Sequence, residues 1–412
     1  SYSIDVYRKQ IEPTHDIVAF TAFLSFFPQL VAGPIERATN LLPQFQKKRT
    51  FDYAQAVDGM RQILWGLFKK IVVADNCATY VDQVFGDIGA HSGSTLLLAA
   101  VLFTFQIYGD FSGYSDIAIG TAKLFGIKLM RNFNVPYFSR DMAEFWRRWH
   151  ISLTTWFRDY VYIPLGGSRP DVPARLEAKG ERRKARYIKW ITVRNTFIIF
   201  LLSGFWHGAN WTFVLWGAYH ALLFVPLLLM NKNRRYRDTV ATIILPDGTI
   251  KTKWLPSLKE AGQMLLTFVL AVLGWIIFRA DSVAIIQEYI VGMCNSSILS
   301  FPNTSGINAL LLNIAVLICV EWWMRTKQHG LDIKHLYPVL RYAIYAGLLF
   351  MLFASVVKPL TLFISNSNET IFDKNYDIFA NHFWINLGVG LYYQQRTTKD
   401  GGLSLYVVGR YA

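Results

Sequence analysis

Long apolar stretches separated by short polar ones recur along most of the chain. They lie around residues 17–33, 57–76, 95–126, 191–230, 262–279, 307–324 and 340–365. Since a membrane-crossing helix needs about 20 apolar residues, the two longest stretches have room for two crossings each, and the pattern predicts about nine crossings in all. Several stretches contain Gly, Pro or polar residues, which is typical of helices packed inside a bundle. We therefore expect an all-α polytopic membrane protein with tilted or re-entrant helices and additional interfacial helices.

Composition and charge support this interpretation. Of the 412 residues, 53% are hydrophobic and only 17% are charged, which excludes an ordinary soluble protein of this size. The net charge of +14 could indicate nucleic-acid binding, but the basic residues gather in short segments between apolar runs, as they do at a membrane surface. Residues 175–189 hold seven Lys or Arg and residues 232–237 hold four, so the positive-inside rule predicts that both segments are cytoplasmic. The stretch 191–230 must then cross the membrane and return.

His207, within the run SGFWHGANW, is the most informative residue of that stretch, because residues 195–231 contain no Lys, Arg, Asp or Glu. An ionisable side chain at membrane depth is costly and usually marks an ion, proton or catalytic site. Imidazole is also the side chain best suited to proton transfer near neutral pH. A structural histidine bonded to a carbonyl between helices is the alternative. The predicted bend of the hairpin beside it consists of Gly204, Gly208 and Ala209.

Residues 132–167 mix Arg, Asp and aromatic side chains too closely for a simple span, which predicts an interfacial helix capped by Ser139. His150 would share a face of this helix with Trp146 and point towards the protein, whereas Arg158 could face water or phosphate. An interfacial polar residue is the alternative role for His150. Two imidazoles could instead divide acid and base roles, or one could orient the other. The expected aromatic stripe consists of Trp146, Trp149, Leu153, Trp156 and Tyr160.

Polar residues also interrupt the apolar stretch 95–126, where a Gly-containing helix break would build a polar cavity inside the membrane. Hydrogen bonds that fasten two helices are the alternative. Lys69 and Lys70 predict a cytoplasmic interface, while Glu321, His220 and His382 are expected to be structural. The polar side chains at the predicted break are Asp110, Ser112, Tyr114, Ser115 and Asp116.

Cysteine spacing and nucleotide-binding motifs exclude some functions. Cys77, Cys294 and Cys319 have neither a disulfide framework nor a zinc spacing, so we expect small buried apolar residues and no metal site. No Walker loop and no G-x-G-x-x-G occur, so energy-coupled nucleotide hydrolysis is not expected.

Five long stretches of the sequence are distinctive enough to compare with known protein families. They are FFPQLVAGPIER, WGLFKKIVVADN, FQIYGDFSGYSDIAIG, NFNVPYFSRDMAEFWRRWHISLTTWFRDYVYIPLGG and RNTFIIFLLSGFWHGANWTFVLWGAYH. In sequence and order they resemble the membrane-bound O-acyltransferase superfamily, specifically the bacterial branch containing the membrane subunit of alginate O-acetyltransferase. The resemblance covers roughly residues 1–225, and the later spans to about 365 are compatible in character.

This resemblance implies a helix bundle around a central tunnel in the bacterial inner membrane, where a cytoplasmic thioester donor meets an acceptor from the opposite face. The essential histidine of the Trp-His-Gly motif corresponds to His207, and the second polar position corresponds to His150. Acetyl-CoA is the expected donor, with no permanently bound cofactor. The expected acceptor is a periplasmic partner protein or an exported polysaccharide, with membrane lipid around the protein and no nucleic acid. Further candidate substrate contacts are Asp110, Ser112, Tyr114, Asp116, Trp146, Arg158, Trp206 and Asn210. Of these, Trp206, Asn210 or a polar group within residues 110–116 could stabilise an oxyanion.

The chain departs from the family pattern at both ends. The usual N-terminal block of apolar helices is missing before Tyr2, so we expect an N-terminally truncated member. Residues 1–365 are predicted to form the acyltransferase domain, and residues 366–412 form an unassigned polar and aromatic tail. One alternative function is D-alanyl or other acyl transfer from a carrier protein to a cell-wall polymer. Another is a non-catalytic transporter or channel in which His207 and Asp110 relay protons.

Overall fold

The computed structural model describes residues 1–366, apart from 31, 179 and 246–248, together with residues 391–397 and 403–409. His382 and most of the tail 366–412 lie outside the described residues. Helices dominate this part of the chain, as predicted. Five of its helices are long and apolar enough to cross a membrane, so the predicted count of nine crossings is not confirmed. These five spans are Gly93–Leu124, Glu181–Trp206, Trp211–Leu229, Leu258–Arg279 and Pro338–Val357.

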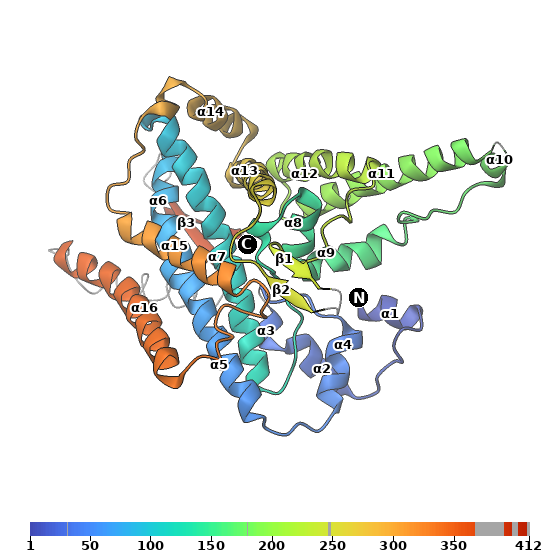
Figure 1. Cartoon of the computed structure of the whole chain (residues 1–412), viewed down its shortest axis with the longest axis horizontal. Coiled ribbons are helices and arrows are strands. Elements are labelled where there is room, and N and C mark those ends of the chain that lie inside the picture. The colour runs from blue at the N-terminus through green and yellow to red at the C-terminus, as the bar shows by residue number, and fades with distance from the viewer. Residues whose placement is uncertain (31, 179, 246–248, 367–390, 398–402, 410–412) are drawn as a thin grey trace.

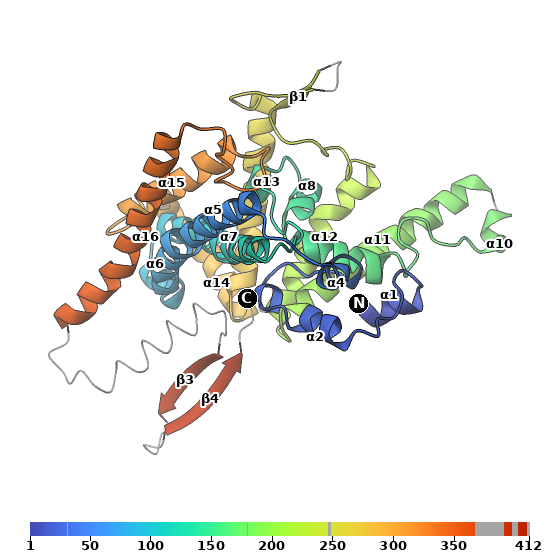
Figure 2. The same cartoon turned by 90° about the horizontal axis from the view of Figure 1, so that it is seen from below.

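The N-terminal part consists of short helices followed by one long rod. The rod is α5 (Tyr53–Leu67), which continues through a π-helical segment (Phe68–Ala74) into α6 (Asp75–Gly86). It lies side by side with α7 (Gly93–Leu124) in both views of the molecule (Figures 1 and 2). The short helices are α1 (Tyr2–Tyr7), α2 (Ile17–Ser25), α3 (Phe27–Leu30) and α4 (Ala38–Gln46).

Glycines let the rod and α7 approach closely. A Cβ atom at Gly66 would lie 2.6 Å from the carbonyl oxygen of Gly113, and one at Gly59 would lie 2.6 Å from that of Gly120. The predicted two legs with a break in this stretch are therefore wrong, because α7 is one continuous helix of 32 residues. Its glycines serve helix packing, in the way small residues do in membrane bundles, and do not bend the chain.

The middle of the chain forms a helical hairpin that carries a protruding arm. Helices α11 (Glu181–Trp206) and α12 (Trp211–Leu229) lie antiparallel, and α10 (Ala174–Glu177) with the start of α11 extends away from the body (Figure 1). Before the hairpin come α8 (Met142–Arg148), α9 (Ile151–Phe157) and a π-helical turn (Arg158–Tyr162).

The C-terminal part adds helices to the same bundle and two small antiparallel sheets. In the first sheet, β1 (Thr242–Ile244) pairs with β2 (Ile250–Thr252), so that Ile243 lies opposite Lys251. In the second, β3 (Leu391–Thr397) pairs with β4 (Leu403–Gly409). The helices are α13 (Leu258–Arg279), α14 (Val283–Met293), α15 (Asn308–Trp323) and α16 (Pro338–Asn366).

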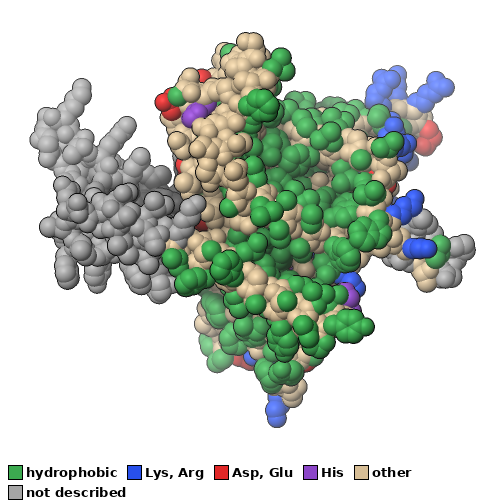
Figure 3. Space-filling view, turned by 60° about the vertical axis from the view of Figure 1, so that its left-hand side comes forward, with side chains coloured by type: hydrophobic (Ala, Val, Ile, Leu, Met, Phe, Trp, Pro, Cys, Tyr) green, Lys and Arg blue, Asp and Glu red, His purple; other side chains and the backbone are tan. Residues whose placement is uncertain are grey.

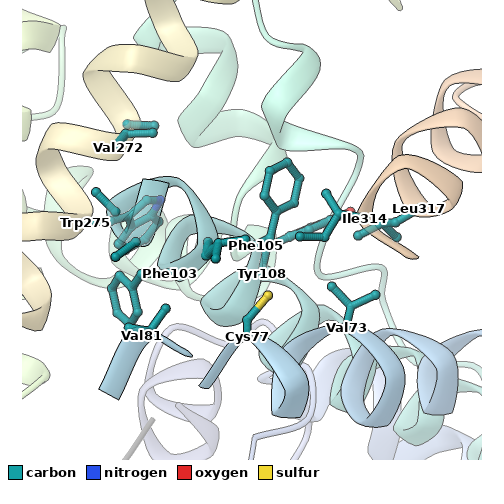
Figure 4. Packing of buried hydrophobic residues seen from close by; sticks show 14 of the residues in the cluster. Val73, Cys77, Val81, Phe103, Phe105, Tyr108, Val272, Trp275, Ile314 and Leu317 are labelled. Carbon is teal, nitrogen blue, oxygen red and sulfur yellow. The ribbon is translucent and has the colours of Figure 1, made fainter. Parts of the chain in front are cut away.

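The hydrophobic core lies where α6, α7, α13 and α15 meet. Figure 4 shows Phe105 and Tyr108 of α7 between Val272 and Trp275 of α13 and Leu317 of α15. Burial of such side chains contributes about 1.5–3 kcal/mol each in water, but a membrane-embedded bundle relies more on close packing.

The three cysteines differ in burial. Cys77 is buried within it, whereas Cys294 and Cys319 are exposed, so the expectation of burial is wrong for those two. Cys319 is exposed because α15 turns only one face towards the bundle.

Apolar side chains also cover a broad outer face of the molecule, with most of the visible Lys and Arg at its margins (Figure 3). This distribution suits a molecule surrounded by lipid, where outward-facing apolar residues need no protein partner.

Candidate active site

The turn between α11 and α12 holds His207. The backbone N–H of His207 donates to the Gly204 carbonyl at 3.0 Å, and Asn210 caps α12 by accepting from the Thr212 N–H at 3.2 Å. Gly204 allows the two helices to converge, because a Cβ atom there would lie 2.1 Å from the Phe213 carbonyl oxygen. The predicted hairpin with its bend near Gly204 and Gly208 is therefore confirmed.

Aromatic rings surround the His207 imidazole. Its ring centroid lies 4.9 Å from that of Trp206, 5.3 Å from Trp216 and 5.1 Å from Phe278. Within the described part of the chain, no hydrogen bond is found to either ring nitrogen. Burial among these rings lowers the pKa of His207 below its usual value, because the charged imidazolium is poorly solvated there.

His150 lies at a break between two short helices, and the predicted continuous helix capped by Ser139 is wrong. Asp141 caps α8 by accepting from the Glu144 N–H at 2.7 Å, whereas the Ser139 hydroxyl donates to the Pro136 carbonyl. His150 then adopts left-handed backbone angles, with φ at 43° and ψ at 56°, before α9 begins. The aromatic stripe therefore does not lie on one continuous helix, although Trp146, Trp149 and Leu153 are all buried.

The His150 side chain points into the protein, as predicted. It is only 3% exposed, and its Nδ1 lies 3.0 Å from the Oδ1 atom of Asn132. Phe111 meets the imidazole edge to face at 4.6 Å. Burial, and to a smaller extent the nearby His207, lower the pKa of His150. Both imidazoles are thus neutral at pH 7, the form in which a histidine can accept a proton.

Both histidines line one cavity of about 1650 Å³. The Trp206 ring lies between them in the cavity wall, with centroids 4.9 Å from His207 and 6.2 Å from His150. At one end, the wall includes Arg234, Arg237 and Arg147, which donates to the Asn233 and Tyr236 carbonyls. Arg158 also lines the cavity, but its guanidinium pairs with Asp159 at 2.6 Å. At the other end, near the α11–α12 turn, it includes Asp82, Asn210, Arg279 and Asp281. The volume exceeds the range of about 300–1,000 Å³ that holds small ligands, so a larger ligand would fit.

The structure brings seven of the ten candidate site residues to this cavity. Asp110 reaches it from α7, but its carboxylate also pairs with Lys70 at 2.7 Å. The others at the cavity are His207, His150, Trp146, Arg158, Trp206 and Asn210.

Ser112, Asp116 and Tyr114 are not brought to the histidines. Ser112 and Asp116 line a separate chamber of about 30 Å³, where Asp116 pairs with Lys69 at 2.5 Å. Lys69 is 3% exposed, so it does not mark the cytoplasmic interface that the sequence predicted. Tyr114, on α7, is half-buried and is not among the described residues that line either cavity.

Sequence reasoning missed Asn132 as a partner of His150. The two residues are 18 positions apart on an irregular segment, and no periodic pattern in a single sequence indicates that they meet. Glu321, expected to be structural, is buried and accepts from the Tyr108 hydroxyl at 2.6 Å in the small chamber. His220 is also buried and packs edge to face against Trp146 at 4.9 Å.

Among the residues that the structure describes, no group of three or more His, Cys, Asp or Glu side chains is placed to hold a metal ion.

The sequence model of the membrane-bound O-acyltransferase family matches residues 7–178 and 187–249, which include both histidines, and the chain belongs to this family. It is 36% identical over 330 residues to a protein named probable alginate O-acetylase AlgI of Pseudomonas aeruginosa, covering 79% of this chain and 56% of that protein. Identity is 35% over 297 residues to the peptidoglycan O-acetyltransferase of Helicobacter pylori, covering 71% and 50%. It is 28% over 287 residues to the teichoic acid D-alanyltransferase of Bacillus subtilis, covering 66% and 62%. The chain spans about half the length of the first two of these relatives.

Proposed function

We propose that this chain is an integral-membrane O-acyltransferase of a bacterial inner membrane. It would move an acetyl group from cytoplasmic acetyl-CoA towards an exported polysaccharide such as alginate. The observation that carries the proposal is the pair of histidines on the wall of one large cavity, and their lowered pKa values support a role in accepting protons. The named activities of two relatives, alginate O-acetylase and peptidoglycan O-acetyltransferase, support acetyl transfer to a polysaccharide.

The basic end of the cavity suits the donor. Arg147, Arg234 and Arg237 lie in the wall there, and Arg234 and Arg237 belong to the basic segment that the positive-inside rule predicts to be cytoplasmic. Arginine side chains bind phosphate groups through paired hydrogen bonds, and a cluster of them raises the local concentration of an anionic nucleotide thioester. The pantetheine arm would then extend along the cavity towards the histidines.

The histidines suit proton transfer at the reacting centre. His207 would take the proton of the acceptor hydroxyl as the oxygen attacks the thioester carbonyl. The C–S bond then breaks, and the leaving thiolate takes the proton back from His207, so the neutral imidazole is regenerated. This scheme describes direct transfer. In the covalent alternative, a protein nucleophile would first displace the thiolate to form an acyl-enzyme, and the acceptor hydroxyl would attack that acyl group in a second step. For the oxyanion, Trp206 is the better candidate, because the Asn210 amide already donates to the Asp281 carbonyl at 2.9 Å.

Purified protein in proteoliposomes, with radiolabelled acetyl-CoA and an oligosaccharide acceptor, tests the function. His207→Ala should abolish transfer, and His150→Ala should lower it at least about tenfold, since a residue that lowers the barrier by about 1.4 kcal/mol changes the rate tenfold. Equal amounts of folded membrane protein must be confirmed for each variant. Full transfer by His207→Ala would reject the proposal.

Carrier-dependent D-alanyl transfer remains the second candidate because of the similarity to teichoic acid D-alanyltransferases. Direct competition between acetyl-CoA and a D-alanyl-loaded carrier protein separates the two donors. Transfer from the loaded carrier alone would favour the second candidate, whereas proton flux through the protein without any acyl transfer would favour a transporter.

A further inference from the structure

Asn132 is wholly buried, and its side-chain amide has a fixed orientation. The amide nitrogen donates to the Ser115 hydroxyl at 3.1 Å. The amide oxygen accepts from the backbone N–H of Ser152 at 3.3 Å and from its hydroxyl at 2.9 Å. The two serine hydroxyls can donate or accept, but the Ser152 backbone N–H can only donate, and a reversed amide would place an N–H group against it. The oxygen is therefore the atom that faces Ser152 and His150.

This orientation determines which nitrogen of His150 carries the proton. The Asn132 oxygen lies 3.0 Å from His150 Nδ1 and can only accept a hydrogen bond. Neutral His150 must therefore be protonated on Nδ1, which leaves its lone pair on Nε2. Nε2 is buried and, among the described residues, has no hydrogen-bond partner.

The backbone of Asn132 holds the same segment. Its carbonyl accepts from the Ile151 N–H at 2.9 Å, and the Asn134 N–H donates to the Arg148 carbonyl at 2.9 Å. His150 lies between these two bonds in its left-handed conformation, which L-residues with a side chain rarely adopt without such support.

The Ser152 hydroxyl also lies 3.4 Å from His150 Nδ1, but its single proton is donated to the Asn132 oxygen at the shorter distance of 2.9 Å. The remaining neighbours of the ring offer no hydrogen-bonding atom at Nδ1. Phe111, Phe133 and Trp206 contact it through uncharged rings. His207 is the titratable group that acts on it electrostatically. Nε2 is thus a buried acceptor without a partner among the described residues, in a side chain that lines the cavity, and such an acceptor is suited to a proton donor of the substrate.

We propose that Asn132 is the positioning residue that fixes His150 as its Nδ1–H tautomer and keeps the Nε2 lone pair free at the wall of the acyl-transfer cavity. The role of that lone pair in the reaction rests on the proposed function, whereas the tautomer does not.

Nitrogen NMR of the full chain with ¹⁵N-labelled histidine tests the tautomer without any assay of activity. The His150 signals are assigned by their loss in His150→Gln. We expect a protonated Nδ1 and an unprotonated Nε2 at pH 7.5, and a shift towards the other tautomer in Asn132→Leu. Asn195→Leu is the matched control, because Asn195 is equally buried and its amide donates to the Leu165 and Gly167 carbonyls, away from both histidines. A protonated Nε2 in the wild type, or unchanged signals in Asn132→Leu, would overturn the proposal.

Kinetics distinguish positioning from simple loss of structure. Asn132→Leu should lower kcat at least about tenfold while KM for the donor changes less than about twofold. Asn132→Asp keeps an acceptor at the same place and should restore much of the rate above pH 8. Its carboxylate should also move the acid limb of the pH profile upwards by about one unit or more, because a nearby negative charge favours the imidazolium.

Two outcomes separate this inference from the proposed function. If the NMR result is as expected but His150→Ala keeps full transfer activity, the catalytic role of His150 fails and the positioning by Asn132 stands. If Asn132→Leu does not fold, Asn132→Asp still decides, because equal loss at every pH would contradict positioning.

Discussion

Burial lowers the pKa of both imidazoles. His150 and His207 lie among aromatic rings, where protonation is disfavoured, so each is held as a proton acceptor across the neutral range. The two rings differ, however, in whether a hydrogen bond fixes their orientation. His150 is bonded through Nδ1, whereas no bond to the His207 ring is found among the described residues. His207 is therefore free to turn towards a substrate hydroxyl, which suits the base, while His150 presents one fixed nitrogen.

This burial predicts the pH dependence of transfer. A base must be neutral to act, and an unperturbed histidine begins to protonate near pH 6.5. Since the pKa values of His150 and His207 are both lowered, we expect kcat/KM to stay level from pH 8 down to about pH 6 and to fall only below that value. Initial rates measured between pH 4.5 and 8.5 check this. A midpoint at pH 6.5 or above would contradict the burial argument.

Stability must be followed over the same range of pH as a control. Because the unfolded chain binds protons on these histidines more readily than the folded chain, the free energy of unfolding should decrease as pH falls below about 6.5. Above that value the two histidines contribute nothing to its pH dependence. Rates should therefore be divided by the folded fraction, measured by tryptophan fluorescence at each pH.

At the scale of helices, the sequence predicted the α11–α12 hairpin but not the form of α7. The hairpin was predictable because basic segments at both ends and glycines at the bend are local signals. In α7, Gly113 and Asp116 suggested a break, but Gly113 packs against the α5 backbone and Asp116 pairs with Lys69. Both compensating contacts come from a distant segment, so only tertiary structure could reveal them.

The break at His150 was missed for a similar reason. Trp146, His150 and Leu153 have helical spacing, which predicts one continuous helix. Instead, backbone bonds from residues 132–134 to 148–151 interrupt the helix. Direction towards the interior was still predicted correctly, because that depended on which residues are apolar and not on the continuity of the helix.

Close packing of α5 on α7 should make the glycines at their contact intolerant of side chains. In Gly66→Ala, the new Cβ would lie 2.6 Å from the Gly113 oxygen and 2.7 Å from Ile117. Overpacking of this kind costs about 1–3 kcal/mol, so the midpoint of thermal unfolding in detergent should decrease by several degrees. Gly347→Ala on α16 is the control, because a Cβ there meets nothing within 4 Å. Equal midpoints for the two variants would show that α5 and α7 are not in close contact.

At the scale of the whole molecule, the cavity connects the two chemically different ends of the membrane domain. Its arginine-rich end includes residues of the segment 232–237, and its other end lies at the α11–α12 turn, on the opposite side of the bilayer by the same topology. His207 lies in that turn, and His150 lies on the other side of the Trp206 ring from it. A donor and an acceptor could thus meet at His207 without either one crossing the membrane.

This arrangement predicts that charge at the arginine-rich end acts on donor binding and not on chemistry. Replacing Arg234 and Arg237 together by Gln should raise KM for acetyl-CoA at least about fivefold, while kcat stays within about twofold. The dependence of KM on salt should also decrease, because exposed charges attract a phosphate-bearing ligand over a distance at which salt screens the attraction. The matched control replaces Arg182 and Arg183 by Gln, which removes the same charge from exposed positions on α11 that do not line the cavity. Initial rates at 20 and 200 mM NaCl measure both effects. If the control raises KM as much as the test variant, the attraction comes from the basic surface as a whole, and the donor is not guided by this end of the cavity.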